Sequence, residues 1–264
     1  LWLSLKNDDV QGDPILTIFK AGDDLRQDQL TLQMMHLMDL MWLDAGLDLR
    51  TINYKCVATG PEIGWIEVVL NCQTTADIQL AAGGVKAAFS EKPLSKWLRK
   101  QNPLDGDLER AVENLVRSCA ASCVATYVLG VCDRHNDNIM ITKDGRLFHI
   151  DFGKFLGNAQ MFGAFRRDRA PFVLTPEFVY AMGGKESRAF ERFCDMACRA
   201  YNVVRANAHV FIALFSMMVS TGIPELQSVD DLDYLQEALS LGLSEADAAA
   251  LFRQLIDESL NTKA

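Results

Sequence analysis

The sequence contains no apolar segment long enough to span a bilayer. The two longest candidates, Cys119 to Val131 and Val210 to Val219, fall short of the roughly 18 apolar residues that a spanning helix requires. Leu1 to Leu5 lacks a basic lead and is too short for the apolar region of a secretory signal. With 17 glycines and 7 prolines, the chain is also too poor in both residues to be collagen-like or a flexible linker.

Cysteines are present but give no sign of a disulfide framework. Their number, seven, is odd and no secretory signal is recognisable, so reduced thiols in the cytosol are expected. Cys119 and Cys123, like Cys194 and Cys198, are four residues apart, which places each pair on one face of a helix. A zinc site would need closer pairs or histidines at ligand spacing, and the four histidines are scattered. Core packing is therefore the favoured interpretation of these thiols.

Positive charge is in short supply. The chain has 26 basic and 35 acidic residues and a net charge of −9, so the whole molecule should be repelled by nucleic acid and by anionic membranes. No nucleic-acid partner is expected, and any anionic ligand must be met by a local basic patch. At 49% hydrophobic and 23% charged residues, the composition is that of a folded globular chain rather than a disordered one.

The hydrophobic pattern predicts an α+β fold with two lobes. Residues 1–70 are expected to form a small, β-rich N-lobe. One amphipathic helix should run from Leu25 to near Gly46, where apolar residues recur at three- and four-residue spacing, and Asp23 or Asp24 would cap its start. The predicted strands are Leu1–Leu5, Ile15–Phe19, Ile52–Ala58 and Trp65–Leu70, the last two joined in a hairpin through residues 59–62.

Residues 71–264 are expected to form a larger, mostly helical C-lobe. A long buried helix is predicted from Leu108 to Leu129, and two strands, Ile139–Thr142 and Leu147–Ile150, should pair through the turn at 143–145. The segment from 155 to 170 shows no periodicity and is predicted to be a loop. Four helical segments should close the chain, at 175–183, 187–207, 208–221 and 229–258, the last broken near Leu241–Gly242.

Polar residues that carry chemistry follow the long helix. Residues 133–138 read Asp-Arg-His-Asn-Asp-Asn, and Asp-Phe-Gly stands at 151–153, just after the second strand of the predicted hairpin. If the two strands pair, Asn138 and Asp151 come to the same end of that hairpin. An amide oxygen and a carboxylate side by side are hard ligands suited to Mg²⁺.

The order and spacing of these residues match the metal-binding parts of protein kinases. There, a catalytic-loop Asp is followed five residues later by a metal-binding Asn, and the Asp of an Asp-Phe-Gly sequence supplies the other ligand. Asp133 and Asn138 have this spacing, although the loop runs Asp-Arg-His rather than His-Arg-Asp. Ordinary turn chemistry is the alternative. It is disfavoured because polar residues between a buried helix and a buried hairpin need a ligand, or one another, as partners.

Lys20 is the second candidate, at the end of a predicted strand and just before the first helix. A lysine that emerges from a strand into a cleft can pair with nucleotide phosphates, as the strand lysine of kinases does. By itself, such a residue is more often a surface lysine whose stem packs on apolar neighbours. The metal-binding pattern further along the chain favours the nucleotide role.

Together these residues resemble the catalytic domain of phosphoinositide 3-kinases over essentially the whole chain. The resemblance rests on residues 18–28, which read Ile-Phe-Lys-Ala-Gly-Asp-Asp-Leu-Arg-Gln-Asp, and on residues 130–140, 149–153 and 171–176. The segments 158–163 and 166–171 are most similar to the class II branch, the phosphatidylinositol 4-phosphate 3-kinases with a C2 domain. The resemblance implies a two-lobed protein-kinase-like fold with a catalytic loop at 130–140 and an activation loop at 151–172.

The resemblance also implies roles for single residues. The catalytic set would be Lys20, Asp133, His135 and Asp151, with Asn138 and Asp151 holding Mg²⁺. The ATP site would be formed by Lys20, Asp28, Tyr54, Ile66, Glu67, Val68, Val69, Met140 and Ile150, with the backbone of residues 67–69 as the hinge that binds adenine. His135 would take the proton from the inositol hydroxyl, with Asp133 positioning it or acting as the base itself. A structural hydrogen bond that holds the loop is the alternative role for His135.

The implied reaction is transfer of the ATP γ-phosphate to the 3-hydroxyl of phosphatidylinositol and phosphatidylinositol 4-phosphate. Arg166, Arg167 and Arg169 would meet the lipid phosphate, whereas residues 157–164 hold no cation for a second phosphate. A protein kinase of the related large Ser/Thr kinase family and a non-catalytic scaffold of kinase shape are the alternatives. The basic loop disfavours the first, and the intact catalytic residues disfavour the second.

The chain departs from the family pattern at both ends. No glycine- or serine-rich loop to cover the phosphates precedes Lys20, and the chain stops before the terminal helix with which the family contacts membranes. We therefore expect a fragment of a catalytic domain, with a truncated N-lobe and poor turnover by itself. The parent protein is expected to carry helical, C2 and PX domains and to act in the cytoplasm. It would work at the periphery of endosomal, vesicle or plasma membranes, where its phosphoinositide partners lie.

Overall fold

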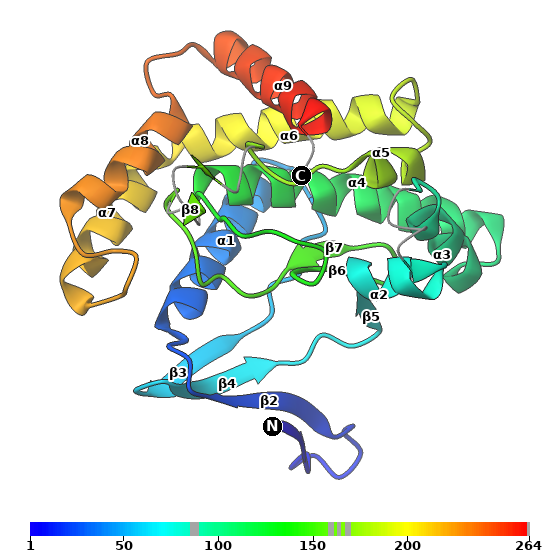
Figure 1. The fold of residues 1–264 in the computed structure, drawn as a ribbon, viewed down its shortest axis with the longest axis horizontal. Helices are drawn as coiled ribbons and strands as arrows, with labels where there is room; N and C mark the ends of the chain where they lie inside the picture. The colour runs from blue at the N-terminus through cyan, green and yellow to red at the C-terminus, as the bar shows by residue number, and fades with distance from the viewer. Residues whose placement is uncertain (85–89, 158–160, 163–164, 167–169, 263–264) are drawn as a thin grey trace.

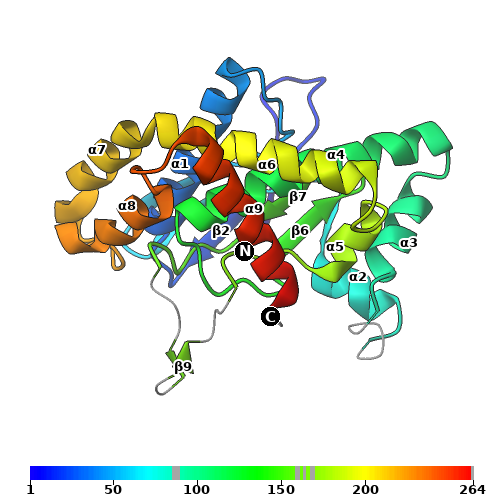
Figure 2. The same cartoon turned by 90° about the horizontal axis from the view of Figure 1, so that it is seen from above.

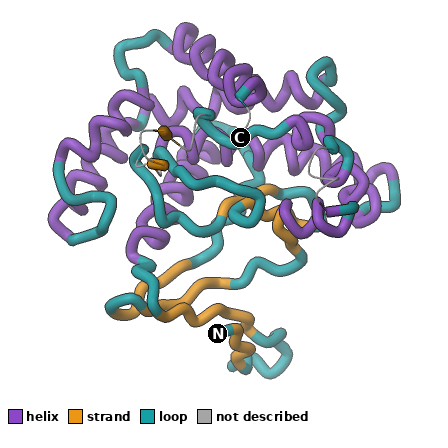
Figure 3. The backbone as a smooth tube through the Cα atoms, viewed as in Figure 1, coloured by secondary structure: helices purple, strands orange, loops and turns teal. Residues whose placement is uncertain are grey.

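The computed structural model describes residues 1–84, 90–157, 161–162, 165–166 and 170–262. Figure 1 shows two lobes: strands β2, β3 and β4 lie at the end that carries the N-terminus, and the helices gather at the other end. Figure 3, which is coloured by secondary structure, makes the same division visible along the backbone. The predicted two-lobed α+β fold is confirmed.

The N-lobe sheet is wholly antiparallel. Its strands are β1 (Trp2–Leu5), β2 (Ile15–Ala21), β4 (Ile63–Glu67) and β3 (Cys56–Gly60), in that spatial order. The predicted β3–β4 hairpin is present, but β3 starts at Cys56 and not at Ile52. The preceding residues bond to other elements instead: Asn53 Nδ2 donates to Asp39 at 2.7 Å, and the Tyr54 hydroxyl donates to the His149 carbonyl at 3.2 Å.

Helix α1 (Arg26–Asp44) joins the two lobes. The prediction that Asp23 or Asp24 caps it is wrong, because the N-cap position is held by Leu25. The Asp24 carboxylate instead accepts hydrogen bonds from the backbone N–H and the guanidinium of Arg26. At the other end of α1, the fully buried Trp42 donates its indole N–H to the carbonyl of Ala200 in α6 (Arg188–Ala206) at 3.0 Å. The helix of the small lobe is thereby fixed to the large one.

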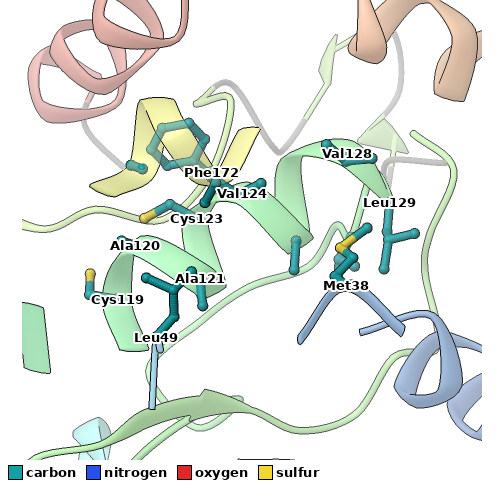
Figure 4. Packing of buried hydrophobic residues seen from close by; sticks show 14 of the residues in the cluster. Met38, Leu49, Cys119, Ala120, Ala121, Cys123, Val124, Val128, Leu129 and Phe172 are labelled. Atoms are coloured by element: carbon teal, nitrogen blue, oxygen red, sulfur yellow. The ribbon is translucent and has the colours of Figure 1, made fainter. Parts of the chain in front are cut away.

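The C-lobe is built around α4 (Asp105–Val128), which packs along α6. Small buried residues of α4, among them Cys119, Ala120 and Cys123, let neighbouring chain segments approach closely, as Figure 4 shows. The other helices are α2 (Thr75–Ala81), α3 (Pro93–Gln101), α5 (Pro176–Ala181), α7 (Ala208–Met218), α8 (Asp233–Leu239) and α9 (Glu245–Asn261), with 3₁₀ turns at Val219–Thr221 and Val229–Leu232. The predicted break near Leu241–Gly242 is confirmed by the gap between α8 and α9.

A second sheet lies in the C-lobe. It contains β5 (Cys72–Thr74), β6 (Ile139–Thr142) and β7 (Leu147–His149), with β6 in the centre. The predicted β6–β7 hairpin is confirmed, with Ile139 opposite His149. Helix α4 is bonded to the hairpin, because Ser118 Oγ of α4 accepts a hydrogen bond from the N–H of Leu147 at 2.8 Å. At its turn, Gly145 has φ +90° and lies so close to α4 that a Cβ atom there would be 2.0 Å from the Ala111 carbonyl oxygen.

The segment predicted as a loop between 155 and 170 is partly regular. Strands β8 (Met161–Phe162) and β9 (Phe165–Arg166) pair with each other, and Figure 2 shows β9 away from the body of the C-lobe. Sequence periodicity does not detect strands of two residues. In the part of the chain that the structure describes, no single helix is long and apolar enough to cross a bilayer; only α6 with the Ala208–Thr221 segment, bent by 61°, passes on length and composition.

Candidate active site

The end of the β6–β7 hairpin brings together the two residues predicted to bind metal. The ladder continues past the strands, since the N–H of Ile150 donates to the Asn138 carbonyl at 3.0 Å. Asn138 and Asp151 therefore lie at the same end of the hairpin, as the sequence predicts. Strand pairing alone produces this arrangement, whatever the side chains then bind.

The side chains at this end fit a hard divalent cation. Asn138 is buried, and its amide nitrogen donates to the Asp133 carbonyl at 3.0 Å, which leaves the amide oxygen for another partner. Asp151 is exposed, with its backbone in the left-handed region at φ +62°. Among the described residues, no group of three or more His, Cys, Asp or Glu side chains is placed to hold a metal ion. An ion held by Asn138 and Asp151 would therefore need further oxygens, such as those of nucleotide phosphates.

Arg134, which the sequence does not single out, holds the backbone next to Asp151. Its guanidinium donates to the Ile150 carbonyl at 2.6 Å and to the Asp151 carbonyl, while Nε donates to the Cys132 carbonyl at 3.0 Å. The guanidinium also lies 5.7 Å from the centre of the Phe152 ring. Burial lowers the pKa of Arg134, although the Asp151 and Asp133 carboxylates oppose that shift. The arginine therefore acts as a fixed cation that joins the catalytic loop to the Asp-Phe-Gly segment.

Asp133 and His135 lie on the same loop in different settings. Asp133 has a left-handed backbone, with φ +57°. The His135 ring is 44% exposed, and its Nδ1 accepts the N–H of Asp137 at 3.3 Å and lies 3.5 Å from the Asp137 carboxylate. The Asp137 carboxylate is thus within ion-pair distance of an exposed imidazole ring.

Lys20 reaches the same region from β2. Its ammonium group pairs with the Asp23 carboxylate, and its side chain is 35% exposed. Burial alone would lower the pKa of Lys20, but the bond to Asp23 and the charges of Asp151 and Asp28 outweigh it, so this pKa is raised. Lys20 therefore lies near enough to Asp151 for their charges to interact, and the ammonium stays charged at neutral pH.

Asp28 is expected in the nucleotide site, and its carboxylate accepts a hydrogen bond from a backbone N–H group. It is buried, and its Oδ1 accepts the N–H of Phe152 at 3.0 Å. Burial raises the pKa of Asp28, while the bond from Phe152 and the charge of Lys20 partly offset that rise. The neighbouring Gln27, which the sequence does not single out, donates from Nε2 to the Phe152 carbonyl at 2.8 Å.

The predicted hinge follows β4. The N–H of Glu67 donates to the Lys55 carbonyl at 2.8 Å, and the N–H of Val68 to the Leu16 carbonyl at 3.4 Å. Among the residues that the structure describes, none accepts a hydrogen bond from the N–H of Val69, so this group can serve an adenine ring. Of the residues predicted to line the adenine pocket, Tyr54 is buried, and Ile66, Met140 and Ile150 are half-buried against the core.

The predicted lipid-binding arginines cannot be placed. The backbone of Arg166 lies in β9, but its side chain, like Arg167 and Arg169 as a whole, falls outside the described residues. Lys154, at the start of the same basic segment, forms an ion pair with Glu225. It already neutralises a carboxylate and is less available to a lipid headgroup than its charge suggests.

His149 is a further buried polar group that the sequence analysis leaves without a role. It is the last residue of β7, its side chain is buried, and its Nδ1 has no hydrogen-bond partner among the described residues. Burial lowers the pKa of His149 to about 3, and the charge of Arg134 adds to the effect. The ring is therefore neutral at physiological pH.

A two-lobed α+β fold, with a strand lysine and an Asn–Asp pair at a hairpin end, defines a kinase-like protein. Residues 15–228 match the family model for phosphatidylinositol 3- and 4-kinase, and the chain belongs to this family. Use of ATP is general to such a kinase family. The resemblance stated from the sequence is confirmed.

The relatives are much longer proteins. Phosphatidylinositol 3-kinase 1 of Dictyostelium discoideum is 58% identical over 264 residues, covering all of this chain and 17% of that protein. The phosphatidylinositol 4-phosphate 3-kinase C2 domain-containing subunits alpha of Pongo abelii and beta of Homo sapiens are both 49% identical, over 99% and 100% of this chain and 16% of each relative. The chain thus spans about one sixth of the length of these relatives.

Proposed function

We propose that this chain is the catalytic part of a lipid kinase that transfers the γ-phosphate of ATP to the 3-hydroxyl of phosphatidylinositol and phosphatidylinositol 4-phosphate. One observation carries the proposal: Asn138 and Asp151 lie at the same end of the hairpin, and Lys20 of the N-lobe is near enough for its charge to interact with Asp151. Family membership supports the same reaction, since the relatives are named phosphatidylinositol 3-kinases.

In this proposal the nucleotide is held from both lobes. The backbone of Glu67–Val69 binds adenine, with Tyr54, Ile66, Met140 and Ile150 around it, and Lys20 pairs with the phosphates. When phosphate arrives, Lys20 exchanges its Asp23 partner for a phosphate oxygen, which costs little because the existing pair is half exposed. Phosphoryl transfer depends mainly on such positioning and on charge neutralisation.

Asn138 and Asp151 would hold Mg²⁺, which when bound neutralises charge on the transferred phosphate. His135 takes the proton that leaves the inositol hydroxyl, and the Asp137 carboxylate stabilises the resulting imidazolium. Asp133 positions the loop or accepts the proton itself. The bond to the γ-phosphorus forms from the hydroxyl oxygen while the bond to ADP breaks, so the reaction needs no further reactant.

The lipid part of the proposal rests on charge. Three positive charges lie close together in this chain of net charge −9, on Arg166, Arg167 and Arg169. Guanidinium groups bind phosphate oxygens in bidentate pairs. Lipid headgroups would meet this loop at a membrane surface. We accordingly propose a cytoplasmic protein that binds endosomal, vesicle or plasma membranes from outside the bilayer. Helical, C2 and PX domains of the parent would supply further contacts, in line with relatives named as C2 domain-containing.

The test is phosphate transfer by the full-length parent protein. It is incubated with Mg²⁺ and labelled ATP, with and without vesicles that contain phosphatidylinositol or its 4-phosphate. Lipid-dependent labelling at the 3-position supports the proposal. Labelling of added protein alone would favour a protein kinase, and tight ATP binding with no transfer would favour a non-catalytic scaffold.

A further inference from the structure

The start of α1 holds the Asp-Phe-Gly segment by its backbone. Gln27 donates to the Phe152 carbonyl at 2.8 Å, and Asp28 accepts the Phe152 N–H at 3.0 Å. Both side chains are buried, as is Phe152. Hydrogen bonds in such a setting are costly to lose, because the partner left behind is cut off from water. The two polar groups of one backbone residue are thus fixed by side chains from the other lobe.

The residue next to this contact is the candidate metal ligand. Asp151 has φ +62°, a conformation that costs a non-glycine residue on the order of 1 kcal/mol and persists only where the surroundings enforce it. Arg134 holds the Ile150 and Asp151 carbonyls on one side, and Gln27 with Asp28 holds Phe152 on the other. The direction of the Asp151 carboxylate is therefore set by neighbours on both sides along the chain.

A third segment anchors both partners. Arg26, just before Gln27, donates to the carbonyls of Thr221 and Gly222, each at 3.0 Å. Lys154, two residues after Phe152, pairs with Glu225, whose side chain is only 14% exposed. Residues 221–225, which we term the 221–225 anchor, thus contact the start of α1 and Lys154, the residue that follows the Asp-Phe-Gly segment. The three segments form a closed ring of contacts.

We propose that Gln27 is a positioning residue for Asp151 and that the 221–225 anchor supports it through Arg26 and the Lys154–Glu225 pair. The inference rests on the proposed function, in which Asp151 meets the metal–nucleotide complex. Gln27 is the informative member, because it is neutral and, among the described residues, its side chain bonds only the Phe152 carbonyl. Asp28 also interacts with the charge of Lys20, so its loss would not separate positioning from phosphate binding.

The first experiment uses the full-length parent with Gln27→Leu, which keeps approximate volume but removes the donor. We expect kcat to fall about 10- to 100-fold, as small misplacements of reacting groups do, and half-maximal activity to require several-fold more Mg²⁺. KM for the lipid should stay unchanged. Gln29→Leu is the matched control, since Gln29 lies on the same helix but accepts the N–H of Ala58 in the N-lobe sheet at 2.9 Å. It should keep the wild-type Mg²⁺ requirement.

The second experiment tests the anchor and needs no catalysis. Calorimetry measures how many-fold Mg²⁺ tightens ATP binding in the wild type, in Gln27→Leu, in Glu225→Gln and in the double reversal Lys154→Glu with Glu225→Lys. We expect the enhancement by Mg²⁺ to shrink several-fold in the first two variants and to recover in the reversal, where the ion pair is restored with opposite polarity.

The outcomes separate the two proposals. A wild-type parent that binds Mg²⁺ and ATP but labels no lipid overturns the proposed function, while the binding comparison still decides the role of Gln27. If Gln27→Leu lowers the thermal stability but leaves the Mg²⁺ enhancement and kcat as in wild type, the contact is packing only and the positioning role is wrong. An unrecovered reversal variant would remove the anchor from the proposal.

Discussion

At the scale of single residues, two residues of the site have left-handed backbone conformations, which residues other than glycine usually avoid. Asp133 and Asp151 both have positive φ, and Arg134, which follows Asp133 in the chain, donates to the backbone carbonyl of Asp151. Such conformations are retained where surrounding contacts over-determine them, which happens often at functional sites. The two aspartates are therefore fixed in place before any ligand arrives, and their chemistry can be tested without disturbing the fold.

Asp151→Asn should abolish turnover that depends on Mg²⁺ and ATP while leaving the protein folded. A carboxylate ligand becomes a neutral amide, and asparagine tolerates the left-handed backbone as well as aspartate does. Asp144→Asn, a similar change at the exposed turn of the same hairpin, serves as control and should leave activity intact. The measurement is lipid phosphorylation together with a thermal melt. Retention of even a tenth of wild-type activity by Asp151→Asn would show that the metal assignment is wrong.

Lys20→Met should also stop catalysis, for a different reason. The variant keeps the apolar stem but removes the charge that meets phosphate. Since the Lys20–Asp23 pair is half exposed, we expect the unfolding free energy to change by less than about 1 kcal/mol. Calorimetric unfolding, with exposed Lys55→Met as control, checks this. A loss of several kcal/mol would instead indicate that Lys20 neutralises a buried carboxylate as part of the core.

His149 predicts a loss of stability in acid. The unfolded chain binds a proton at this residue below the usual pKa of 6.5, whereas burial keeps the pKa of the folded residue at about 3. The unfolded state binds more protons between these values, so the contribution is complete above pH 6.5 and is lost as the pH falls. Relative to His149→Gln, the wild type should lose about 2 kcal/mol more between pH 7 and pH 5 in urea unfolding. Equal losses would mean that the ring is protonated in the fold; exposed His36→Gln is the control.

At the scale of elements, the β6–β7 hairpin depends on its contact with α4. Gly145→Ala would force a Cβ atom into the backbone of α4 at Ala111 and strain a backbone with φ +90°. We expect a loss of about 2–4 kcal/mol in unfolding free energy. Gly106→Ala, in the first turn of α4 with nothing near its added methyl group, should be neutral or stabilising by up to about 1 kcal/mol. A cost below 1 kcal/mol for Gly145→Ala would show that the hairpin can move away from α4.

The elements that the sequence predicts well are those with strong local signals. The hairpin follows from two apolar runs around a Lys-Asp-Gly turn, and β6 has the predicted bounds. Helix α4 follows from its periodicity to within a few residues. The errors lie where side-chain partners decide. The Tyr54 hydroxyl bonds to the distant His149 carbonyl, and the Asp24 carboxylate bonds to the nearby Arg26 in place of capping α1.

The same contrast holds for the site. The convergence of Asn138 and Asp151 could be predicted because the order and spacing of the two residues follow a known pattern. The roles of Gln27 and Arg134 could not be predicted, because both side chains bond to backbone carbonyls. Every residue has a backbone carbonyl, so the sequence does not indicate which one a side chain will bind. The partner of Gln27 is 125 residues away along the chain.

At the scale of the whole molecule, charge should decide which lipids are used. In the proposed function Arg166, Arg167 and Arg169 would meet one phosphate, whereas residues 157–164 contain no cation for a second and Lys154 is already paired with Glu225. An unmatched phosphate should cost about 1–3 kcal/mol, roughly a 5- to 150-fold preference. The full-length parent should therefore phosphorylate phosphatidylinositol and its 4-phosphate, with the 4,5-bisphosphate a poor substrate in mixed vesicles.

The residues just before β8 offer a gain-of-function check. Introducing Asn158→Lys, Ala159→Lys and Gln160→Lys together should raise use of the bisphosphate if the middle of the loop excludes it. Comparable turnover of all three lipids by the wild-type parent would refute the charge argument.

The buried thiols of this molecule can report when each part of it unfolds. Cys72 and Cys198 are partly exposed, whereas the other five sulfurs are buried. Burial raises the pKa of Cys194 and of Cys56 to about 12, which suppresses the reactive thiolate while the chain is native. A thiol-reactive dye should therefore label the partly exposed Cys72 and Cys198 in the native protein. It should label the five buried cysteines only when the structure around each of them opens. Cys56 would time the opening of the small sheet and Cys194 the separation of α6 from its neighbours, so one unlabelled protein carries a separate reporter in each lobe.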